Sequence, residues 1–208
     1  MIEKIKEGII DGNRKGVATD VAKALEAGVK PEEILNGAMI PAMAEVGRLY
    51  EQGEFYIPEM LVSARSMSAG MEILRPLLKQ GDLKPLGKVV IGTAQGDLHD
   101  IGKNLVAMML EGNGFEVTDL GNDVSPEKFI EAVKASGAQI VAISALVTTT
   151  MAAMGRTVEA FKAAGLRDQV KVIVGGAPLS QAYADSIGAD GYSADANAAV
   201  QLAKKLVA

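Results

Sequence analysis

The stretch Gly96-Asp97-Leu98-His99-Asp100-Ile101-Gly102 contains the only histidine among the 208 residues. It follows residues 88–95, a β-branched apolar run of strand length, and precedes residues 101–114, where apolar side chains recur at helical spacing. A loop that leaves the carboxyl end of a buried strand and enters a helix is where open α/β sheets bind ligands, because backbone N–H groups and side chains converge there. The sequence therefore places His99 at a candidate ligand site.

From residue 88 onward the pattern alternates between strand and helix. Strands are expected at 88–95, 115–121, 138–146, 170–176 and 190–193, and helices are expected to begin near Ile101, Ser125, Thr149, Leu179 and Asp195. Unbroken apolar runs such as 140–143 are typical of strands that are buried on both faces of a parallel sheet. With right-handed crossovers, these units predict a flavodoxin-like, doubly wound, five-stranded parallel sheet of order 2-1-3-4-5.

The first part of the chain shows only helical periodicity. Four helical segments are expected at 2–10, 17–27, 31–52 and 57–78, and four helices with short connections predict a bundle domain over residues 1–80. Residues 81–87 are read as a linker because they lie in a stretch with glycine, proline and polar side chains but no periodicity. The α/β domain then covers residues 88–208.

Composition excludes several classes of function. The formal net charge of −5 and the lack of a basic stripe argue against nucleic-acid binding. The sequence has no cysteine, which excludes disulfides and thiolate chemistry and is compatible with the cytoplasm, the expected location. No apolar run approaches the roughly 20 residues of a membrane span. We therefore expect neither a nucleic acid nor a membrane as a partner.

The sequence also lacks the residues that the common functions of doubly wound sheets require. A phosphate-accepting signalling domain needs acidic residues where the third strand ends, but this strand ends with Ser144-Ala145-Leu146. The spacing of Gly92, Gly96 and Gly102 does not match the dinucleotide-binding fingerprint, and no nucleophile elbow is visible. The sheet must serve another kind of ligand.

Special residues follow three of the predicted strands. The first strand is followed by 96–102, the third by Ser144-x-Leu146 with Thr148-Thr149-Thr150, and the fourth by Gly175-Gly176. These strands are neighbours in the expected order, so their carboxyl ends would line one crevice.

The combination D-x-H-x-x-G, S-x-L and G-G resembles the cobalamin-binding domain of the methionine synthase and methylmalonyl-CoA mutase group. More specifically, GDLHDIGKN, SALVTTTM, VGGAP and IGADGY resemble the methyl-carrying corrinoid proteins of anaerobic three-component methyltransferase systems. Residues 46–59 match the helical cap of that family. The resemblance covers nearly the whole chain.

This resemblance implies a cobalamin cofactor, methylcobalamin in one state, with its own base displaced. His99 would be the lower cobalt ligand, Asp97 would hold its other nitrogen, and Ser144 would continue the hydrogen-bond network. Gly102, Gly175 and Gly176 would permit close approach of the backbone to the cofactor. The remaining cofactor-binding residues implied are Asp100, Ile101, Leu146, Thr148 and, in the helical cap above the corrin ring, Tyr56 and Met60.

Each assignment has a simpler structural alternative. Asp97 is also a plausible helix cap, Ser144 a small residue at a strand end, and Gly175-Gly176 an ordinary turn. Met60 lies at a position typical of bundle core. A solvated helix start explains Asp100, Lys103 and Asn104 equally well.

The implied function is a methyl carrier. A substrate-specific methyltransferase would load the cobalt, a second methyltransferase with a tetrahydrofolate or thiol acceptor would unload it, and a reductive activation protein would be a third partner. The chain itself need not be a complete enzyme. Three alternatives stay open: a subunit of an adenosylcobalamin mutase, a cobalamin-dependent regulator, and an interaction domain without cofactor. The helical cap disfavours the mutase, and the missing basic helix pair disfavours the regulator.

Overall fold

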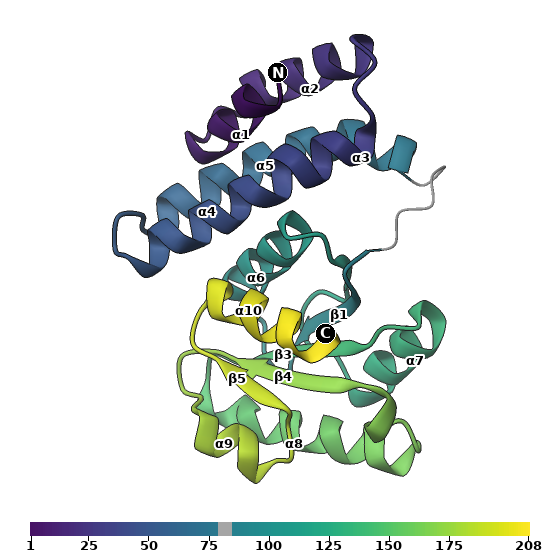
Figure 1. Ribbon diagram of the computed structural model, residues 1–208. Coiled ribbons are helices and arrows are strands. Elements are labelled where there is room, and N and C mark those ends of the chain that lie inside the picture. The colour runs from purple at the N-terminus through teal and green to yellow at the C-terminus, as the bar shows by residue number, and fades with distance from the viewer. Residues whose placement is uncertain (79–84) are drawn as a thin grey trace. The chain divides into compact units, whose positions relative to one another are not determined.

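The computed structural model describes residues 1–78 and 85–208, which form two compact units (Figure 1). The first unit is helical, and the second alternates strands and helices. The predicted domain limits of 1–80 and 88–208 stay predictions, since the linker at 81–87 falls largely outside the described residues.

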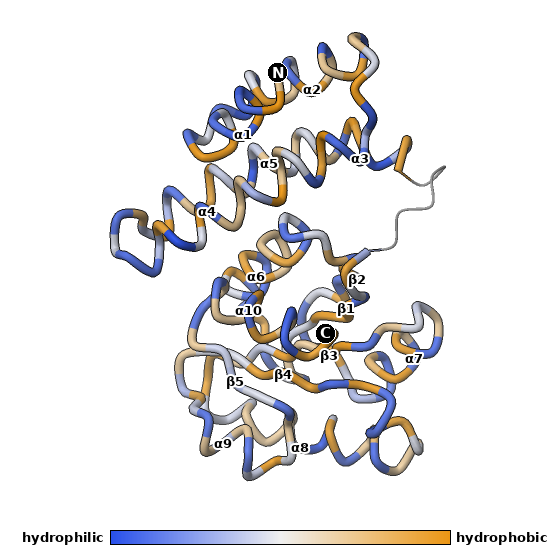
Figure 2. Tube along the Cα trace, in the orientation of Figure 1, coloured by the Kyte–Doolittle hydropathy of each residue, from blue (hydrophilic) through white to orange (hydrophobic). Residues whose placement is uncertain are grey.

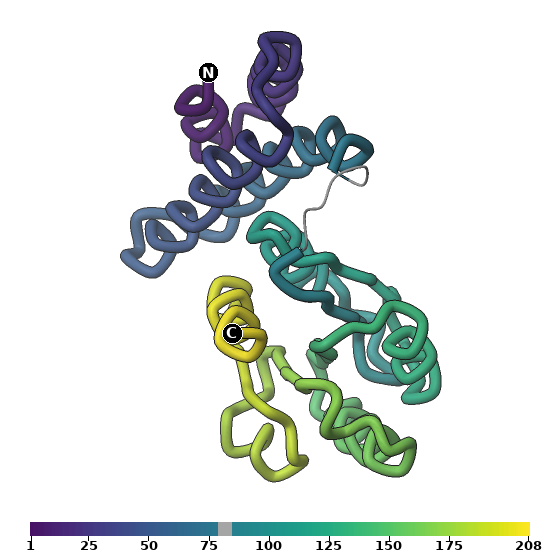
Figure 3. Tube along the Cα trace, turned by 45° about the vertical axis from the view of Figure 1, so that its right-hand side comes forward, coloured from purple at the N-terminus to yellow at the C-terminus, as the bar shows by residue number. Residues whose placement is uncertain are grey.

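The helical unit consists of α1 (Ile2–Ile10), α2 (Arg14–Glu26), α3 (Pro31–Ile34), the π-helical turn η1 (Leu35–Met39), α4 (Ile40–Glu51) and α5 (Ile57–Leu78). Figures 1 and 3 both show α4 running beside α5, which also packs against α2. Helix α2 begins three residues earlier than predicted, because the Asn13 side chain accepts a hydrogen bond from Gly16 N at 3.0 Å and caps the first turn.

The third predicted helix, 31–52, contains a π-helical turn that the sequence analysis did not foresee. Pro41 has no backbone N–H, and its ring conflicts with the carbonyl four residues earlier, at Gly37. The wider turn of η1 surrounds that carbonyl and lets the helix continue through the proline. The interruption is therefore local.

The sheet of the second unit has five parallel strands in the order β2-β1-β3-β4-β5, as predicted. They are β1 (Lys88–Thr93), β2 (Glu116–Asp119), β3 (Ile140–Ser144), β4 (Lys171–Gly175) and β5 (Gly191–Ser193). Strands β1, β2 and β3 each end two residues earlier than expected. Beyond β1 the ladder with β2 continues only as an isolated bridge from Ala94 to Val124, which leaves the next residues free to build loops.

Helices cover both faces of the sheet. Figures 1 and 3 show α6 (Ile101–Gly112) and α10 (Ala196–Val207) on one face, and α7 (Pro126–Ser136), α8 (Thr148–Ala163) and α9 (Gln181–Ser186) on the other. A short 3-10 turn, η2 (Arg167–Gln169), precedes β4. Strands β1 and β3 appear as hydrophobic stretches in Figure 2, in keeping with the burial of nearly all of their residues.

The core on the α7 and α8 face follows from strand register. Val90, Val141 and Val172 are aligned across three strands, and they pack in one cluster with Phe129 and Phe161. This buried layer fixes β1 and β3 side by side, so the loops at their carboxyl ends must meet. No helix within 1–78 or 85–208 has the length and apolar character needed to cross a membrane.

Candidate functional site

The loop between β1 and α6, residues 94–100, is called the histidine loop here. It turns sharply after β1, with Asp97 N donating to the Ala94 carbonyl at 2.9 Å. Gly96 has φ +89°, in the left-handed region that glycine adopts without steric cost. The turn carries the side chain of Asp97 inward, where it is fully buried.

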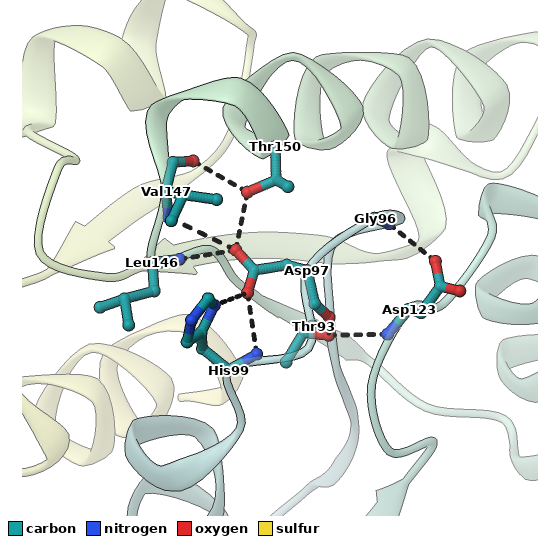
Figure 4. Close-up of polar contacts among 8 residues, drawn as sticks. All are labelled: Thr93, Gly96, Asp97, His99, Asp123, Leu146, Val147 and Thr150. Carbon is teal, nitrogen blue, oxygen red and sulfur yellow. Dashed lines mark hydrogen bonds and ion pairs between the residues drawn. The ribbon is translucent and has the colours of Figure 1, made fainter.

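The Asp97 carboxylate joins two loops. Its Oδ1 accepts hydrogen bonds from the backbone N–H and from the ring Nδ1 of His99, both at 2.9 Å (Figure 4). Its Oδ2 accepts from Leu146 N at 2.8 Å and from the Thr150 hydroxyl at 2.7 Å, both in the segment that follows β3. One buried carboxylate therefore links the histidine loop to the start of α8.

The charge of Asp97 is set by these contacts. Burial, the largest single influence, raises the pKa of its carboxyl group. The hydrogen bonds from Thr150, from the His99 and Leu146 amides and from the His99 ring together outweigh burial and bring the pKa well below the usual range of an aspartic acid. Asp97 is consequently an anion at neutral pH.

The His99 ring is oriented by this anion. An ionised carboxylate only accepts hydrogen bonds, so Nδ1 carries the proton that faces Asp97. In the neutral imidazole the lone pair then lies on Nε2, which has no hydrogen-bond partner within the described part of the chain. The side chain is 54% exposed, so this nitrogen is accessible. The arrangement therefore presents one candidate ligand atom, His99 Nε2, on a ring whose orientation is fixed.

Large apolar side chains next to His99 in sequence, and in the segment whose amides bind Asp97, are also not buried. Leu98 and Ile101 flank His99 in sequence and are 67% and 85% exposed, and Leu146 and Val147 contact Asp97 through their amides and are also exposed. We call these four residues the apolar rim. Such a concentration of exposed apolar side chains marks a binding surface.

The described residues contain no cluster of three or more His, Asp or Glu side chains that could hold a metal ion. His99 alone offers a single donor atom.

Comparison with known proteins shows the family of the chain. A family model described as a B12 binding domain matches residues 87–201, and a second model of the same description matches residues 1–75. The chain belongs to the B12-binding corrinoid protein family.

Two relatives come from Methanosarcina acetivorans. Trimethylamine corrinoid protein 1 is 45% identical over 198 residues, which cover 94% of this chain and 92% of the relative. Dimethylamine corrinoid protein 3 is 42% identical and covers 100% and 97% of the two chains. The structure of the methanol:cobalamin methyltransferase complex from Methanosarcina barkeri matches with a TM-score of 0.89 at 31% identity, covering 99% of this chain and 79% of that one.

The site of this B12-binding protein fits a corrinoid. A corrin macrocycle brings its own equatorial nitrogen ligands and an extended apolar periphery, so it needs from the protein one axial donor and apolar contact. His99 Nε2 and the apolar rim supply these two elements in one place. The predicted pairing of Asp97 with His99 is thus present as a contact of 2.9 Å.

The predicted network beyond Asp97 runs through a different residue. Ser144, at the end of β3, is half-buried and is not a donor to the Asp97 carboxylate among the described contacts. Thr150 makes that hydrogen bond instead, and Thr148 lies exposed at the first position of α8. Side chains in a first helical turn point back toward the helix N-terminus, so the third threonine of the run could have been chosen from sequence.

The three predicted glycines have different surroundings. A Cβ on Gly176, which has φ +135°, would lie 1.9 Å from the Ala145 carbonyl oxygen, and one on Gly175 would lie 3.2 Å from the Ser193 carbonyl. The fold itself therefore requires glycine at 176. A Cβ on Gly102 would meet nothing within 4 Å. Only Gly102 lacks a packing reason.

The interpretation of Lys103 as part of a solvated helix start is wrong. Its side chain is only 1% exposed and pairs with Asp119 at the end of β2, with 2.5 Å from Nζ to Oδ1. Helix α6 buries this position against the sheet, so the ammonium group needs a local anion. Asp100 begins the helix through its carbonyl, which accepts from Asn104 N at 2.8 Å.

The two predicted cap residues differ in exposure. Tyr56 is 66% exposed at the start of α5, where its N–H donates to the Glu59 carboxylate at 3.0 Å, whereas Met60 is buried. Their position above a corrin ring stays a prediction.

Proposed function

We propose that this chain carries a methyl group on a corrinoid cofactor between two methyltransferases in a system that uses methylamines. The observation that supports it most directly is the single histidine, held by a buried anion that links the two segments with the exposed side chains of the apolar rim. When bound, the corrinoid cobalt supplies a nucleophilic centre that takes up a methyl group and gives it to an acceptor.

The residues of this chain would hold the cofactor from below. His99 would bind cobalt through Nε2 in place of the cofactor's own base. Asp97 would keep Nδ1 protonated and hold the orientation of the imidazole ring. Thr150 and the Leu146 amide would keep Asp97 ionised and in place. With the cofactor bound, the Asp97–His99 pair would be able to hold a proton beside the ligand nitrogen.

The methyl donor is proposed from the named relatives. The trimethylamine and dimethylamine corrinoid proteins are 45% and 42% identical to this chain, whereas the chain matched in the methanol-specific complex is 31% identical. The donor partner would then be a methylamine methyltransferase. An acceptor methyltransferase and a reductive activation protein complete the proposed set of partners.

The lone histidine permits a direct test. The chain is produced with ¹⁵N-labelled histidine, loaded with cobalamin and reduced to the paramagnetic cobalt state for electron paramagnetic resonance. Each unlabelled axial nitrogen splits cobalt lines into triplets, and a ¹⁵N nitrogen splits them into doublets. Doublets are expected, and triplets that persist in the labelled chain would rule out His99 as the ligand.

The carrier role is tested separately with the loaded chain. It is incubated with methylamine methyltransferases and, in parallel, with a methanol-specific one, and methylation of the cofactor is followed by absorbance. Methylation only with an amine and its enzyme is expected. Methylation by none of them, despite bound cobalamin, would remove the proposed carrier function.

A further inference from the structure

The loop that follows β2, residues 120–125, contacts the histidine loop at its turn. Asp123 Oδ1 accepts a hydrogen bond from Gly96 N at 2.7 Å, and Asp123 N donates to Thr93 Oγ1 at 2.9 Å (Figure 4). The same N–H lies 3.0 Å from the Asp97 carbonyl oxygen. Asp123, in the loop after the neighbouring strand, therefore makes hydrogen bonds to three residues of the turn, Thr93, Gly96 and Asp97.

The second member of this contact is Thr93, the last residue of β1, which is fully buried. Its hydroxyl donates to the Asp97 carbonyl at 2.5 Å while accepting from Asp123 N. The carbonyl of Asp97 is thus held by Thr93 and Asp123, and its carboxylate is held by the α8 segment. Fixing both ends of Asp97 leaves its side chain little freedom to turn.

The backbone of Asp123 is unusual. With φ +51° it is the one residue other than glycine, within the described ranges, that has a positive φ. Aspartate tolerates this region better than most residues, but such conformations persist only where the surroundings impose them. Here the conformation directs both the N–H and the carboxylate of Asp123 toward the histidine loop.

We propose that Asp123 is a positioning residue for His99. It fixes the turn at Gly96 and Asp97 from the β2 side, and Asp97 in turn sets the tautomer and direction of the imidazole. The proposal rests on the proposed function, in which the direction of Nε2 determines cobalt ligation. Asp123 acts through Asp97, since its contacts here are with Thr93, Gly96 and Asp97.

A matched control lies at the opposite ends of the strands. Asp190 Oδ2 accepts a hydrogen bond from Val172 N at 2.7 Å, the same distance as from Gly96 N to Asp123. Both carboxylates thus bind a backbone amide across two segments, but Asp190 precedes β5 at the amino end of the sheet. Asp190→Ala therefore removes a similar amide contact, together with the ion pairs of Asp190 to Arg167 and Lys171, far from the histidine loop.

The test compares Asp123→Gly, Asp123→Asn and Asp190→Ala. Glycine keeps the positive φ without strain and removes the whole side chain with its carboxylate, while asparagine keeps the side-chain length and an oxygen acceptor and tolerates the same backbone. Two readings use the cofactor-free chain: amide exchange at Gly96 and the tautomer of the single histidine by ¹⁵N NMR at alkaline pH. A third reading is the histidine-ligated share of bound cobalamin, measured by the labelled resonance experiment.

For Asp123→Gly we expect amide exchange at Gly96 to rise at least about tenfold, the Nδ1–H tautomer to lose population, and the ratio of ligated to unligated cobalt to fall about tenfold. For Asp123→Asn we expect all three measured values to lie close to those of wild type. Asp190→Ala should be less stable than wild type but should change none of the three values. Unchanged readings in Asp123→Gly, or equal changes in Asp190→Ala, would overturn the proposal. If wild type itself lacks histidine-ligated cobalt, the proposed ligation by His99 fails, and the two cofactor-free readings still decide the role of Asp123.

Discussion

The two ends of the sheet use polar side chains in opposite ways. At the amino ends of the strands, Asp190 pairs with Arg167 at 2.7 Å and with Lys171 at 3.5 Å, and it also accepts from Val172 N. Arg167 in addition donates to the carbonyls of Val170 and Gly188. These groups bind each other and the backbone, and each has a partner within the protein.

At the carboxyl ends of β1 and β3 the polar contacts converge on Asp97, but one polar atom there has no partner within the described part of the chain. The carboxylate has four well-placed donors, but the ring that it orients presents a nitrogen without a partner among the described residues, beside the exposed apolar rim. This difference indicates that the polar groups at the amino ends of the strands stabilise the fold. Those at the carboxyl ends have the arrangement expected where a parallel sheet binds a ligand.

Asp97→Ala should have the largest effect. It leaves the Leu146 N–H and the His99 N–H without an acceptor and leaves the Thr150 hydroxyl with only the Val147 carbonyl, which we expect to lower the free energy of unfolding by about 4 kcal/mol. Arg167→Ala, the matched change at the amino ends, should cost about 1–2 kcal/mol because its partner stays partly accessible to water. Amide exchange in β1 and β3 measures the stability of this unit alone.

The same comparison has a pH dependence. The pKa of Asp97 is lower in the folded chain than in the unfolded one, so its stabilising contribution is present above the unfolded value of about 3.9 and is lost as the pH falls below it. Asp97→Asn should therefore flatten the loss of stability in acid, whereas Arg167→Ala should keep it. An equally steep acid loss in Asp97→Asn would assign that loss to other carboxylates.

A buried ion pair at the carboxyl ends gives the next largest effect. Lys103 is almost fully buried, whereas the side chain of its partner Asp119 is 38% exposed. Asp119→Ala leaves an ammonium group buried and unpaired and should cost about 3 kcal/mol. Lys103→Met leaves a carboxylate that water and Gly121 N still reach, so it should cost less than about 1 kcal/mol. Equal losses in urea unfolding would contradict this asymmetry.

The architecture could be predicted from sequence because the relevant patterns are local. Apolar runs such as 140–143 and the cap at Ser125 identify strands and helices within a few residues, and crossover handedness then permits few strand orders. The π-helical turn was missed, although Pro41 marked it. The Asp97–His99 contact was implied by the resemblance to the corrinoid proteins, and the structure contains it between two residues that only Leu98 separates.

The rest of the site depends on contacts between distant segments. Thr150 reaches Asp97 across 53 positions and Asp123 reaches Gly96 across 27, so neither contact lies within one motif, although the helical position of Thr150 made it the better choice within its own run. The burial of Lys103 follows from how α6 lies on the sheet, which periodicity alone does not give. Sequence reasoning identified the histidine and its partner but not the residues that hold the partner in place.

The smallest effect on stability is expected at Gly102, and it separates packing from ligand binding. Gly176 is required by the backbone of the protein itself, whereas Gly102 lies in the first turn of α6 with open space where a Cβ would be. Because alanine favours a helix over glycine, Gly102→Ala should stabilise the cofactor-free chain by about 0.5–1 kcal/mol. Urea unfolding without cofactor checks this gain.

Cobalamin binding by the same variant then decides why glycine is present. A helix position that would be more stable with alanine needs another reason for glycine, and Gly102 lies one residue after Ile101 of the apolar rim. If the bound corrinoid approaches the backbone there, one added methyl group should weaken cobalamin binding about tenfold while the cofactor-free chain becomes more stable. Unchanged affinity in titrations with cobalamin would mean that the ligand does not approach this turn, and glycine at 102 would then serve neither packing nor cofactor binding.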